Sequence, residues 1–175
     1  MILDSVKIRK AKLSDNRIIF VIRNQKTSLK YFKLVKYNEH KTWFIENFKS
    51  KKNIFYVASI RNRVIGFVKF KHSNKNVSDL SYHVTENLQG RGYGTKILKQ
   101  SVTKFFQQNR EKKKITAKVF KKNVASIKCF IRARFEKKKV DKFIYYEFKK
   151  TNLNKQTISL FISGLSGLEL LNNIK

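Results

Sequence analysis

The segment Leu88–Thr95, with the sequence LQGRGYGT, has the residue types and the spacing of a phosphate-binding turn. Its glycines follow an alternating apolar segment, Val77–Val84, and lead into an apolar pattern of helical period that begins at Tyr93. Glycine lets a backbone approach an anion closely, and the start of a helix offers unpaired N–H groups and a positive dipole end. The spacing differs from that of a P-loop and from the G-x-G-x-x-G dinucleotide fingerprint. The stretch therefore indicates a phosphate-binding turn of another kind.

This turn resembles Gln-x-x-Gly-x-Gly, the pyrophosphate loop of the GNAT (Gcn5-related) N-acetyltransferase family, with Gln89, Gly92 and Gly94 at the fixed positions. The segment Asn123–Phe135 is similar to a second motif of that family, Asn-x-x-Ala/Ser-x-x-Leu-Tyr-x-x-x-Gly-Phe. The resemblance covers about residues 5–150. It implies a fold of the α/β (α+β) class, with a mixed central sheet of about seven strands and flanking helices.

The resemblance also implies acetyl-CoA as the co-substrate, and no metal ion. Backbone N–H groups of Gly90–Thr95 would hold the pyrophosphate, and the strand around His83 would lie beside the pantetheine arm. A backbone N–H near Val84 would polarise the thioester carbonyl, as an oxyanion hole does. The residues expected to bind the cofactor are Tyr82, His83, Val84, Gln89, Gly90, Arg91, Gly92, Tyr93, Gly94, Thr95 and Asn123.

The pair of catalytic side chains that many family members use is missing from this sequence. Lys118 stands at the position of the usual glutamate, and Phe130 stands at the position of the usual tyrosine. Direct attack of an amine on the thioester needs a base for the amine and a proton for the leaving thiolate. His83, with an ordinary pKa of about 6.5, is the expected base, and Tyr145 is the expected acid. Glu86 and proton transfer to bulk water are the alternatives.

Two further segments, Val21–Asn24 and His40–Phe44, are similar to the W-R-N…H-x-x-W-F pattern of one GNAT subgroup. That subgroup includes the enzymes that N-acetylate a 4-amino sugar on UDP in pseudaminic acid biosynthesis. Ile22 stands here where the subgroup has its first tryptophan. An aromatic ring can stack on a sugar or on uracil, and a guanidinium can pair with a phosphate. The expected acceptor is therefore a nucleotide sugar, and the expected substrate-binding residues are Arg23, Asn24, His40 and Trp43.

These assignments have alternatives. Trp43 on an apolar helical stripe can belong to the core, and Arg23 at a helix end can complement the helix dipole. A different acceptor would be the amine of a protein or peptide, such as the N-terminus of a ribosomal protein. A non-catalytic module that binds acyl-CoA or nucleic acid is the third reading. Because the aromatic residues fall on core-like stripes, the pattern argues against nucleic acid.

The chain of 175 residues has a formal net charge of +30, from 41 basic and 11 acidic side chains. The lysines are spread along the whole sequence, so the charge indicates compositional drift rather than a nucleic-acid-binding arm. Cys129 is the one cysteine, which excludes an intrachain disulfide and suits a reducing compartment. The sequence has no run of about 18 apolar residues and no signal-peptide pattern. We therefore expect a cytoplasmic protein without a membrane partner.

The apolar pattern also predicts the elements that position these residues. Strands are expected over residues 6–11, 54–60, 64–72, 77–84 and 114–120, followed by a last pair that begins at Phe135 and ends at Lys149. Helices are expected after a Ser14-Asp15 cap, after an Asn38 cap, over residues 93–107 and after an Asn123 cap, with a loop at 26–36. The acetyltransferase domain is expected over residues 1–150. Residues 151–175 are expected to form an added helix that packs on this domain or on the partner subunit of a homodimer.

Overall fold

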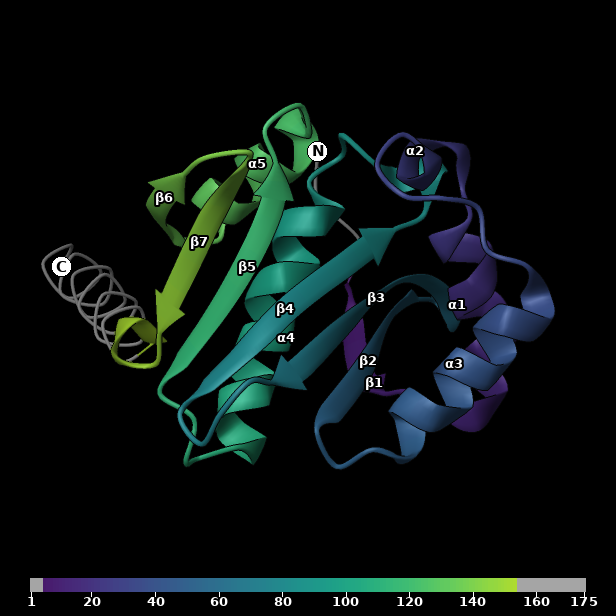
Figure 1. The fold of residues 1–175 in the computed structure, drawn as a ribbon, viewed down its shortest axis with the longest axis horizontal. Coiled ribbons are helices and arrows are strands. Elements are labelled where there is room, and N and C mark those ends of the chain that lie inside the picture. Colours follow the sequence, from purple (N-terminus) through teal and green to yellow (C-terminus); the bar gives the residue numbers. More distant parts are fainter. Residues whose placement is uncertain (1–4, 154–175) are drawn as a thin grey trace, which may run out of the picture.

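The computed structural model describes residues 5–153 and contains a mixed sheet of seven strands in the order β1-β2-β3-β4-β5-β7-β6 (Figure 1). Neighbouring strands are antiparallel except β4 and β5, which are parallel. The strands are β1 (Lys7–Lys10), β2 (Asn53–Ile60), β3 (Arg63–His72), β4 (Val77–Val84), β5 (Lys114–Phe120), β6 (Glu136–Val140) and β7 (Phe143–Lys149). The helices are α1 (Asn16–Arg23), α2 (Lys26–Leu29), α3 (Tyr37–Lys49), α4 (Tyr93–Gln108) and α5 (Val124–Arg132), with short 3₁₀ turns η1 (Leu13–Asp15) and η2 (Glu86–Leu88). The predicted fold class and strand number are confirmed.

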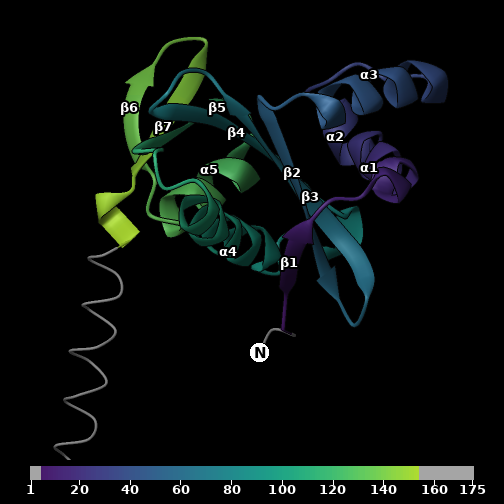
Figure 2. The same ribbon diagram turned by 90° about the horizontal axis from the view of Figure 1, so that it is seen from below.

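Helices cover both faces of the sheet. Figure 2 shows α4 and α5 on one face and α1 to α3 on the other. Side chains of a strand point alternately to the two faces. In β2, Tyr56 and Ala58 pack against the α4 side, whereas Phe55 and Val57 pack against the α1 and α3 side. The middle of this strand is therefore apolar at every position.

The strands β4 and β5 separate halfway along their length. Their ladder runs from the pair Val77–Lys114 to the pair Leu80–Ala117 and ends there. Beyond this point β4 stays paired with β3, and β5 stays paired with β7. The two strands diverge in Figure 1, which leaves the last residues of β4 with a backbone edge that faces a gap.

Several local signals in the sequence are confirmed. Arg61 and Asn62 both have positive φ and connect β2 to β3 in a hairpin, which is formed by the two strands expected over residues 54–60 and 64–72. Asn123 caps α5, because its Oδ1 accepts a hydrogen bond from the Ser126 N–H at 3.1 Å. The helix ends with Arg134 at φ 64°, a left-handed position that glycine usually occupies.

Three local predictions need correction. Asp15 is the residue before α1, as predicted, but its carboxylate makes no capping hydrogen bond; it binds the Arg9 guanidinium at 2.7 Å, because the strand β1 brings that cation beside it. The helix α3 begins at Tyr37, before Asn38, and the Glu39 carboxylate accepts the Lys36 N–H at 3.4 Å. The segment 26–36 is not entirely loop, because it contains α2.

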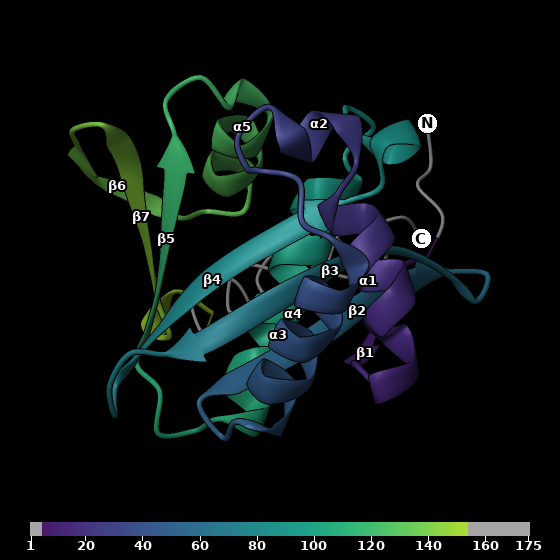
Figure 3. The ribbon, with the colours of Figure 1, turned by 45° about the vertical axis from the view of Figure 1, so that its right-hand side comes forward.

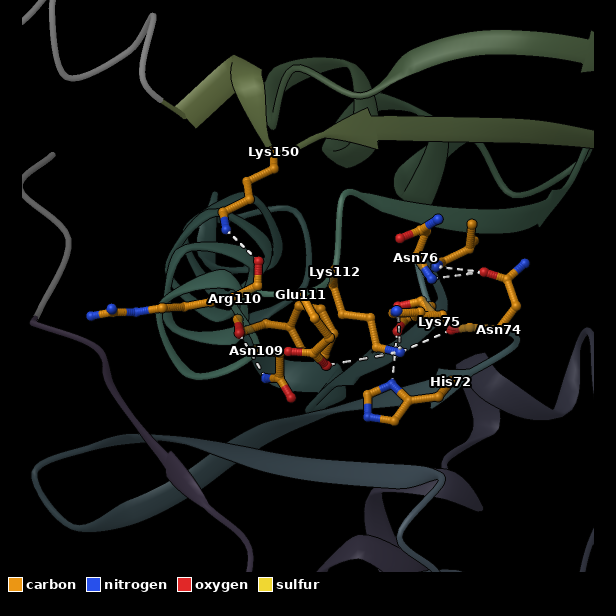
Figure 4. A network of polar contacts seen from close by, with 12 residues as sticks. His72, Asn74, Lys75, Asn76, Asn109, Arg110, Glu111, Lys112 and Lys150 are labelled. Atoms are coloured by element: carbon orange, nitrogen blue, oxygen red, sulfur yellow. Dashed lines mark hydrogen bonds and ion pairs between the residues drawn. The ribbon is translucent and has the colours of Figure 1, made fainter.

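A buried lysine connects two turns at the end of the sheet where β4 begins (Figure 4). Lys112 is 5% exposed, and its Nζ donates to the carbonyl oxygens of Asn74 at 2.8 Å and Lys75 at 3.1 Å. The Glu111 carboxylate lies 3.9 Å from the same nitrogen. Since backbone carbonyls accept two of its protons, Lys112 is a structural cross-link between the β3–β4 turn and the α4–β5 connection.

Within residues 5–153, none of the helices has the length and apolar character needed to cross a membrane. The apolar positions of the helix predicted after residue 150 begin at Ile158 and lie outside the described residues. The division into a domain over 1–150 and an extension over 151–175 stays a prediction.

Candidate active site

A cavity of about 470 Å³ lies where β4 and β5 separate. One wall comes from α2 and the residues after it, a second from the end of β4 and the glycine turn, and a third from Asn123 and α5. Figure 3 shows α2 and α5 at the end of the molecule where β4 leaves β5. Tyr31 connects the first wall to the end of β5, because its ring stacks on Phe120 with centroids 5.6 Å apart. The cavity therefore gathers segments that are far apart in the sequence.

The predicted phosphate-binding turn faces this cavity. Gly90 and Gly92 have φ of 75° and 87°, and Gly92 is the residue before the first turn of the 16-residue helix α4. A Cβ added at Gly94 would lie 2.9 Å from Sγ of Cys129, so α5 packs directly against the start of α4. Backbone N–H groups at a helix start, in a turn that only glycine adopts without strain, suit an anion.

The last residue of β4 presents its backbone to the gap. The N–H of Thr85 donates to the Ile65 carbonyl at 2.8 Å and so points toward β3. In a strand, the N–H and C=O of one residue point to the same edge, and those of the next residue point to the opposite edge. The N–H and C=O of Val84 therefore point toward β5. The Gln89 amide donates to the Val84 carbonyl at 3.0 Å and to the Thr27 hydroxyl at 2.9 Å. This leaves the Val84 N–H as a donor directed into the gap.

His83 lines the cavity and is held on two sides. Its ring stacks on Phe67, with centroids 4.9 Å apart and planes 15° apart, and its Nδ1 lies 3.1 Å from the Ser28 hydroxyl. Burial, together with the nearby positive charge of Arg23, lowers the pKa of His83 from 6.5 to about 4. The imidazole is therefore neutral at physiological pH.

Tyr82 lies on the other side of β4 from His83, and its hydroxyl is 3.4 Å from Oγ of Ser126. Burial raises the pKa of Tyr82, so the phenol stays protonated and can donate a hydrogen bond. Phe130, at the position of the usual family tyrosine, is 2% exposed and packs edge-on against the Tyr82 ring at 5.6 Å. The phenol in this part of the wall is therefore that of Tyr82.

Not every predicted cofactor or catalytic residue reaches the cavity. Arg91 is exposed and Tyr93 is buried in the core, and neither belongs to the lining. Tyr145 is also absent from the lining, because alternation along β7 turns the Tyr146 ring into the core and Tyr145 away from it. Its ring instead lies 5.7 Å from Nζ of Lys118. The structure thus does not bring Tyr145 to His83, so nothing in the geometry supports its expected role as the acid.

The side chains of Arg23 and Asn24 support the cavity wall from behind. Nη2 of Arg23 donates to the Lys33 carbonyl at 3.0 Å, and its guanidinium lies 5.0 Å from the centroid of Phe32. The Asn24 amide donates to the Val35 carbonyl at 2.7 Å and accepts the Val35 N–H at 3.3 Å. Both residues therefore fix the segment after α2, and neither lines the cavity.

His40 and Trp43 lie in the packing of α3, outside the cavity lining. His40 is 2% exposed and contacts Phe20 and Phe44 with ring centroids 5.4 and 6.0 Å away. Burial lowers its pKa. The Trp43 ring lies 4.7 Å from Nζ of Lys69, a half-buried lysine whose pKa burial lowers to about 8. His40 is buried in this packing, whereas Trp43 is 40% exposed. Neither ring lines the cavity, so the geometry gives no support to their predicted stacking on a substrate there.

Sequence reasoning missed most of the first wall. Ser28 and Phe32 come from a segment without clear period, so nothing in the sequence assigned them to a site. Lys128 and Arg132 also line the cavity, and their i, i+4 spacing on α5 was an available signal. None of the lining residues, all of which lie in the described part of the chain, is Asp or Glu. The wall is therefore positively charged.

Among residues 5–153, no group of three or more His, Cys, Asp or Glu side chains could hold a metal ion.

The comparisons with known proteins agree with this geometry. The family model for the acetyltransferase (GNAT) domain matches residues 5–136. No curated protein matches the sequence. The structure is similar to spermidine N-acetyltransferase from Vibrio cholerae in complex with CoA and spermine, with a TM-score of 0.73 and 13% identity over 83% of this chain and 96% of that chain.

Two further solved structures are similar at this level. Aminoglycoside acetyltransferase AAC(6')-Ib in complex with coenzyme A and kanamycin has a TM-score of 0.72 and 15% identity, over 86% of this chain and 98% of that chain. A domain from Methanocaldococcus jannaschii has a TM-score of 0.71 and 21% identity, over 83% of this chain and 98% of that chain. Such low identities establish the fold alone, whereas the family match spans most of the chain. This protein belongs to the GNAT acetyltransferase family.

Proposed function

We propose that this protein transfers the acetyl group of acetyl-CoA to a primary amine, and that the amine is the 4-amino group of a UDP-linked amino sugar. The observation that supports acetyl transfer most strongly is the gap between β4 and β5, which opens beside the glycine turn at the start of α4. The cavity at this gap contains the free backbone edge of β4, the Val84 N–H as a hydrogen-bond donor, and the glycine turn as an anion site. A thioester of a phosphorylated cofactor needs these three features.

Acetyl-CoA would bind with its pyrophosphate on the N–H groups of Gly90–Thr95 and its pantetheine arm along the free edge of β4. The thioester carbonyl would then accept the Val84 N–H, which stabilises the negative charge that develops on this oxygen during attack. The amine forms the new bond to the acetyl carbon, and the bond from that carbon to sulfur breaks. The thiolate that leaves takes up a proton, and the attacking nitrogen loses one.

His83 is the side chain proposed to contact the amine. Since Ser28 engages Nδ1, the other ring nitrogen is the one available to a substrate. With a pKa of about 4, the ring is a weak base. We therefore infer that His83 mainly orients a neutral amine by hydrogen bonding, and that the amine proton passes to water.

The positive charge of the cavity wall affects which acceptor amine can bind. A polycation such as spermine or kanamycin needs carboxylates, and the lining of this cavity contains none. Lys128 and Arg132 favour an amine that carries negative charge elsewhere, as a UDP-linked sugar does. Nη1 of Arg23 is buried without a hydrogen-bond partner among the described residues, and the charge of this side chain acts on His83. The nucleotide-sugar proposal is therefore supported by the charges of Lys128 and Arg132 in the lining, and Arg23 adds positive charge from behind the wall.

A thiol-release assay tests both parts of the proposal. Acetyl-CoA is incubated with a UDP-4-amino sugar, the corresponding free amino sugar, peptides with free N-termini, and spermidine. We expect turnover that is fastest with the UDP-linked amine, and a selective loss of that preference in Lys128→Ala/Arg132→Ala. Turnover with peptides alone would replace the nucleotide sugar by a protein acceptor. Acetyl-CoA binding without turnover on any amine would point to a non-catalytic acyl-CoA module.

A further inference from the structure

Apolar side chains are concentrated on the surface of one segment, residues 26–37, which we name the rim loop. It comprises α2 and the residues up to the first residue of α3. Leu34 is 70% exposed, the most of any large apolar residue in the described chain, and Leu29, Phe32 and Tyr37 are 37, 43 and 39% exposed. Exposed apolar residues that occur singly need no explanation, whereas a group of this size in twelve residues does.

The same loop is strongly basic. Four exposed lysines alternate with its apolar residues, and residues 26–38 contain no Asp or Glu; the lysines are Lys26, Lys30, Lys33 and Lys36. Apolar side chains flanked by lysines match a surface that has negative charge outside and hydrocarbon beneath. We propose that the rim loop docks on an anionic lipid bilayer, with Leu29 and Leu34 in the acyl boundary and the lysines among the headgroups. This proposal is independent of the proposed acetyl transfer.

Single-stranded nucleic acid is the competing polyanion, and the aromatic rings argue against it. Binding of bases needs exposed ring faces. The Tyr31 ring is stacked on Phe120, and the Arg23 guanidinium covers the Phe32 ring at 5.0 Å. The most exposed apolar group of the loop is the aliphatic Leu34, which cannot stack on a base but can enter a lipid layer.

The loop is held in place for such a contact. The hydrogen bonds from Arg23 to the Lys33 carbonyl and between Asn24 and the Val35 backbone lie on either side of Leu34. Figures 1 and 3 place α2 at the upper edge of the molecule. Because Phe32 also lines the cavity, docking through this loop would bring the cavity to the membrane surface.

Vesicle flotation with the full-length protein tests the proposal. The probes are vesicles of phosphatidylcholine alone and vesicles of phosphatidylcholine mixed with phosphatidylglycerol. We expect binding only to the phosphatidylglycerol vesicles. Leu34→Ser should weaken it about tenfold, since a leucine side chain then no longer leaves water. Leu13→Ser is the matched control: Leu13 is 53% exposed and also has basic neighbours, so this variant should bind like the unchanged protein.

A second pair of variants separates the loop from the net charge of the chain. Lys30→Gln/Lys33→Gln/Lys36→Gln should weaken binding on the order of 100-fold, from roughly fivefold for each lysine at the surface. Lys137→Gln/Lys138→Gln/Lys139→Gln removes the same charge from the exposed strand β6 and should have a much smaller effect. Circular dichroism and acetyl-CoA binding of all variants show whether the fold is preserved.

Four outcomes would overturn the proposal. Equal losses in the two lysine variants would indicate general adsorption by charge. Equal binding to phosphatidylcholine vesicles would exclude an anionic surface. Tight binding of single-stranded RNA that depends on Leu34, without vesicle binding, would assign the loop to nucleic acid. A change of oligomeric state in Leu34→Ser, with vesicle binding unaltered, would make the loop a subunit interface.

Discussion

The Ser28 hydroxyl lies 3.1 Å from Nδ1 of His83, and this contact joins α2 to the end of β4 across 55 residues of chain. Phe67 supports the ring from one face at 4.9 Å, so contacts from two elements fix its orientation. Burial, together with the positive charge of Arg23, lowers the pKa of this ring to about 4. It is neutral because its surroundings exclude water, and it is oriented because Ser28 engages one nitrogen.

This low pKa predicts how stability depends on pH. The folded His83 protonates near pH 4, whereas the unfolded one protonates near pH 6.5. Between these values the unfolded chain binds more protons, so stability falls as the pH is lowered through this window. The difference corresponds to roughly 3 kcal/mol at most. His83→Gln should flatten the dependence of the unfolding free energy on pH between 4 and 6.5, measured by urea denaturation.

His40 and His72 also have lowered pKa values, so in His83→Gln the pH dependence of stability should shrink and not vanish.

The same variant tests the role of His83 in turnover. If His83 orients the amine, His83→Gln should retain more activity than His83→Ala, and the deficit should be the same at high and neutral pH. A deficit that disappears at high pH would instead identify His83 as a true base.

The contact between Gly94 and Cys129 predicts a steric effect on cofactor binding. In Gly94→Ala the new Cβ would lie 2.9 Å from Sγ of Cys129 and would push the start of α4 away from α5. Overpacking of this kind costs about 1–3 kcal/mol of stability. We expect acetyl-CoA affinity to fall as well, because the displaced start of α4 no longer presents its N–H groups to the pyrophosphate. Titration calorimetry measures the affinity, and a thermal melt verifies folding.

Cys129→Ala removes the sulfur and provides the control. The double variant Gly94→Ala/Cys129→Ala should recover most of the affinity, since the new methyl then has room. If Gly94→Ala alone bound acetyl-CoA normally, the turn would not be the pyrophosphate site.

Asn123 caps α5 and is also predicted to contact the cofactor, and two substitutions separate these roles. Asn123→Asp keeps an oxygen that can accept the Ser126 N–H, so stability should change little. Asn123→Ala should cost about 1 kcal/mol of stability, because the cap is lost. Weaker acetyl-CoA binding by Asn123→Asp at an unchanged melting temperature would place the cofactor beside this residue, because the variant loses the amide N–H groups and adds a negative charge next to an anionic cofactor. Normal binding by this variant would restrict Asn123 to capping.

The buried cross-link of Lys112 predicts a loss of stability without a loss of function. Lys112→Met should destabilise the fold by about 1–3 kcal/mol, because the carbonyls of Asn74 and Lys75 lose their donor. Lys113→Met, at the exposed neighbouring position, should lie within about 0.5 kcal/mol of the unchanged protein. Acetyl-CoA affinity should be unaltered in both variants, since these turns lie at the end of β4 away from the cavity. A matching destabilisation in the two variants would contradict the cross-link.

The features that could be predicted from the sequence are those that depend on neighbours in the chain. The alternation in β4, the glycines at positive φ and the Asn123 cap each reflect a backbone conformation over a few residues, so residue types and spacing reveal them. The order of these elements then indicates the family and its sheet. The resemblance implies that the strand around His83 lies beside the pantetheine arm, and the ladder between β4 and β5, which ends at Leu80, leaves that edge of β4 free.

Other features were decided by packing between distant segments. Arg23 and Asn24 matched a substrate-binding pattern, yet their side chains hold residues 33–35, because the chain after α2 folds back onto the end of α1. Tyr145 and Tyr146 differ in the sequence only by one position, and the orientation of β7 buries one and turns the other away from the cavity. Likewise, lysines occur along the whole chain. The rim loop differs from other lysine-containing segments because its leucines are exposed, and this exposure is known only from the tertiary structure. Solvent exposure and contacts across the sheet arise from how the segments pack. Neither can be predicted from the local sequence of a segment without periodicity, such as residues 26–36.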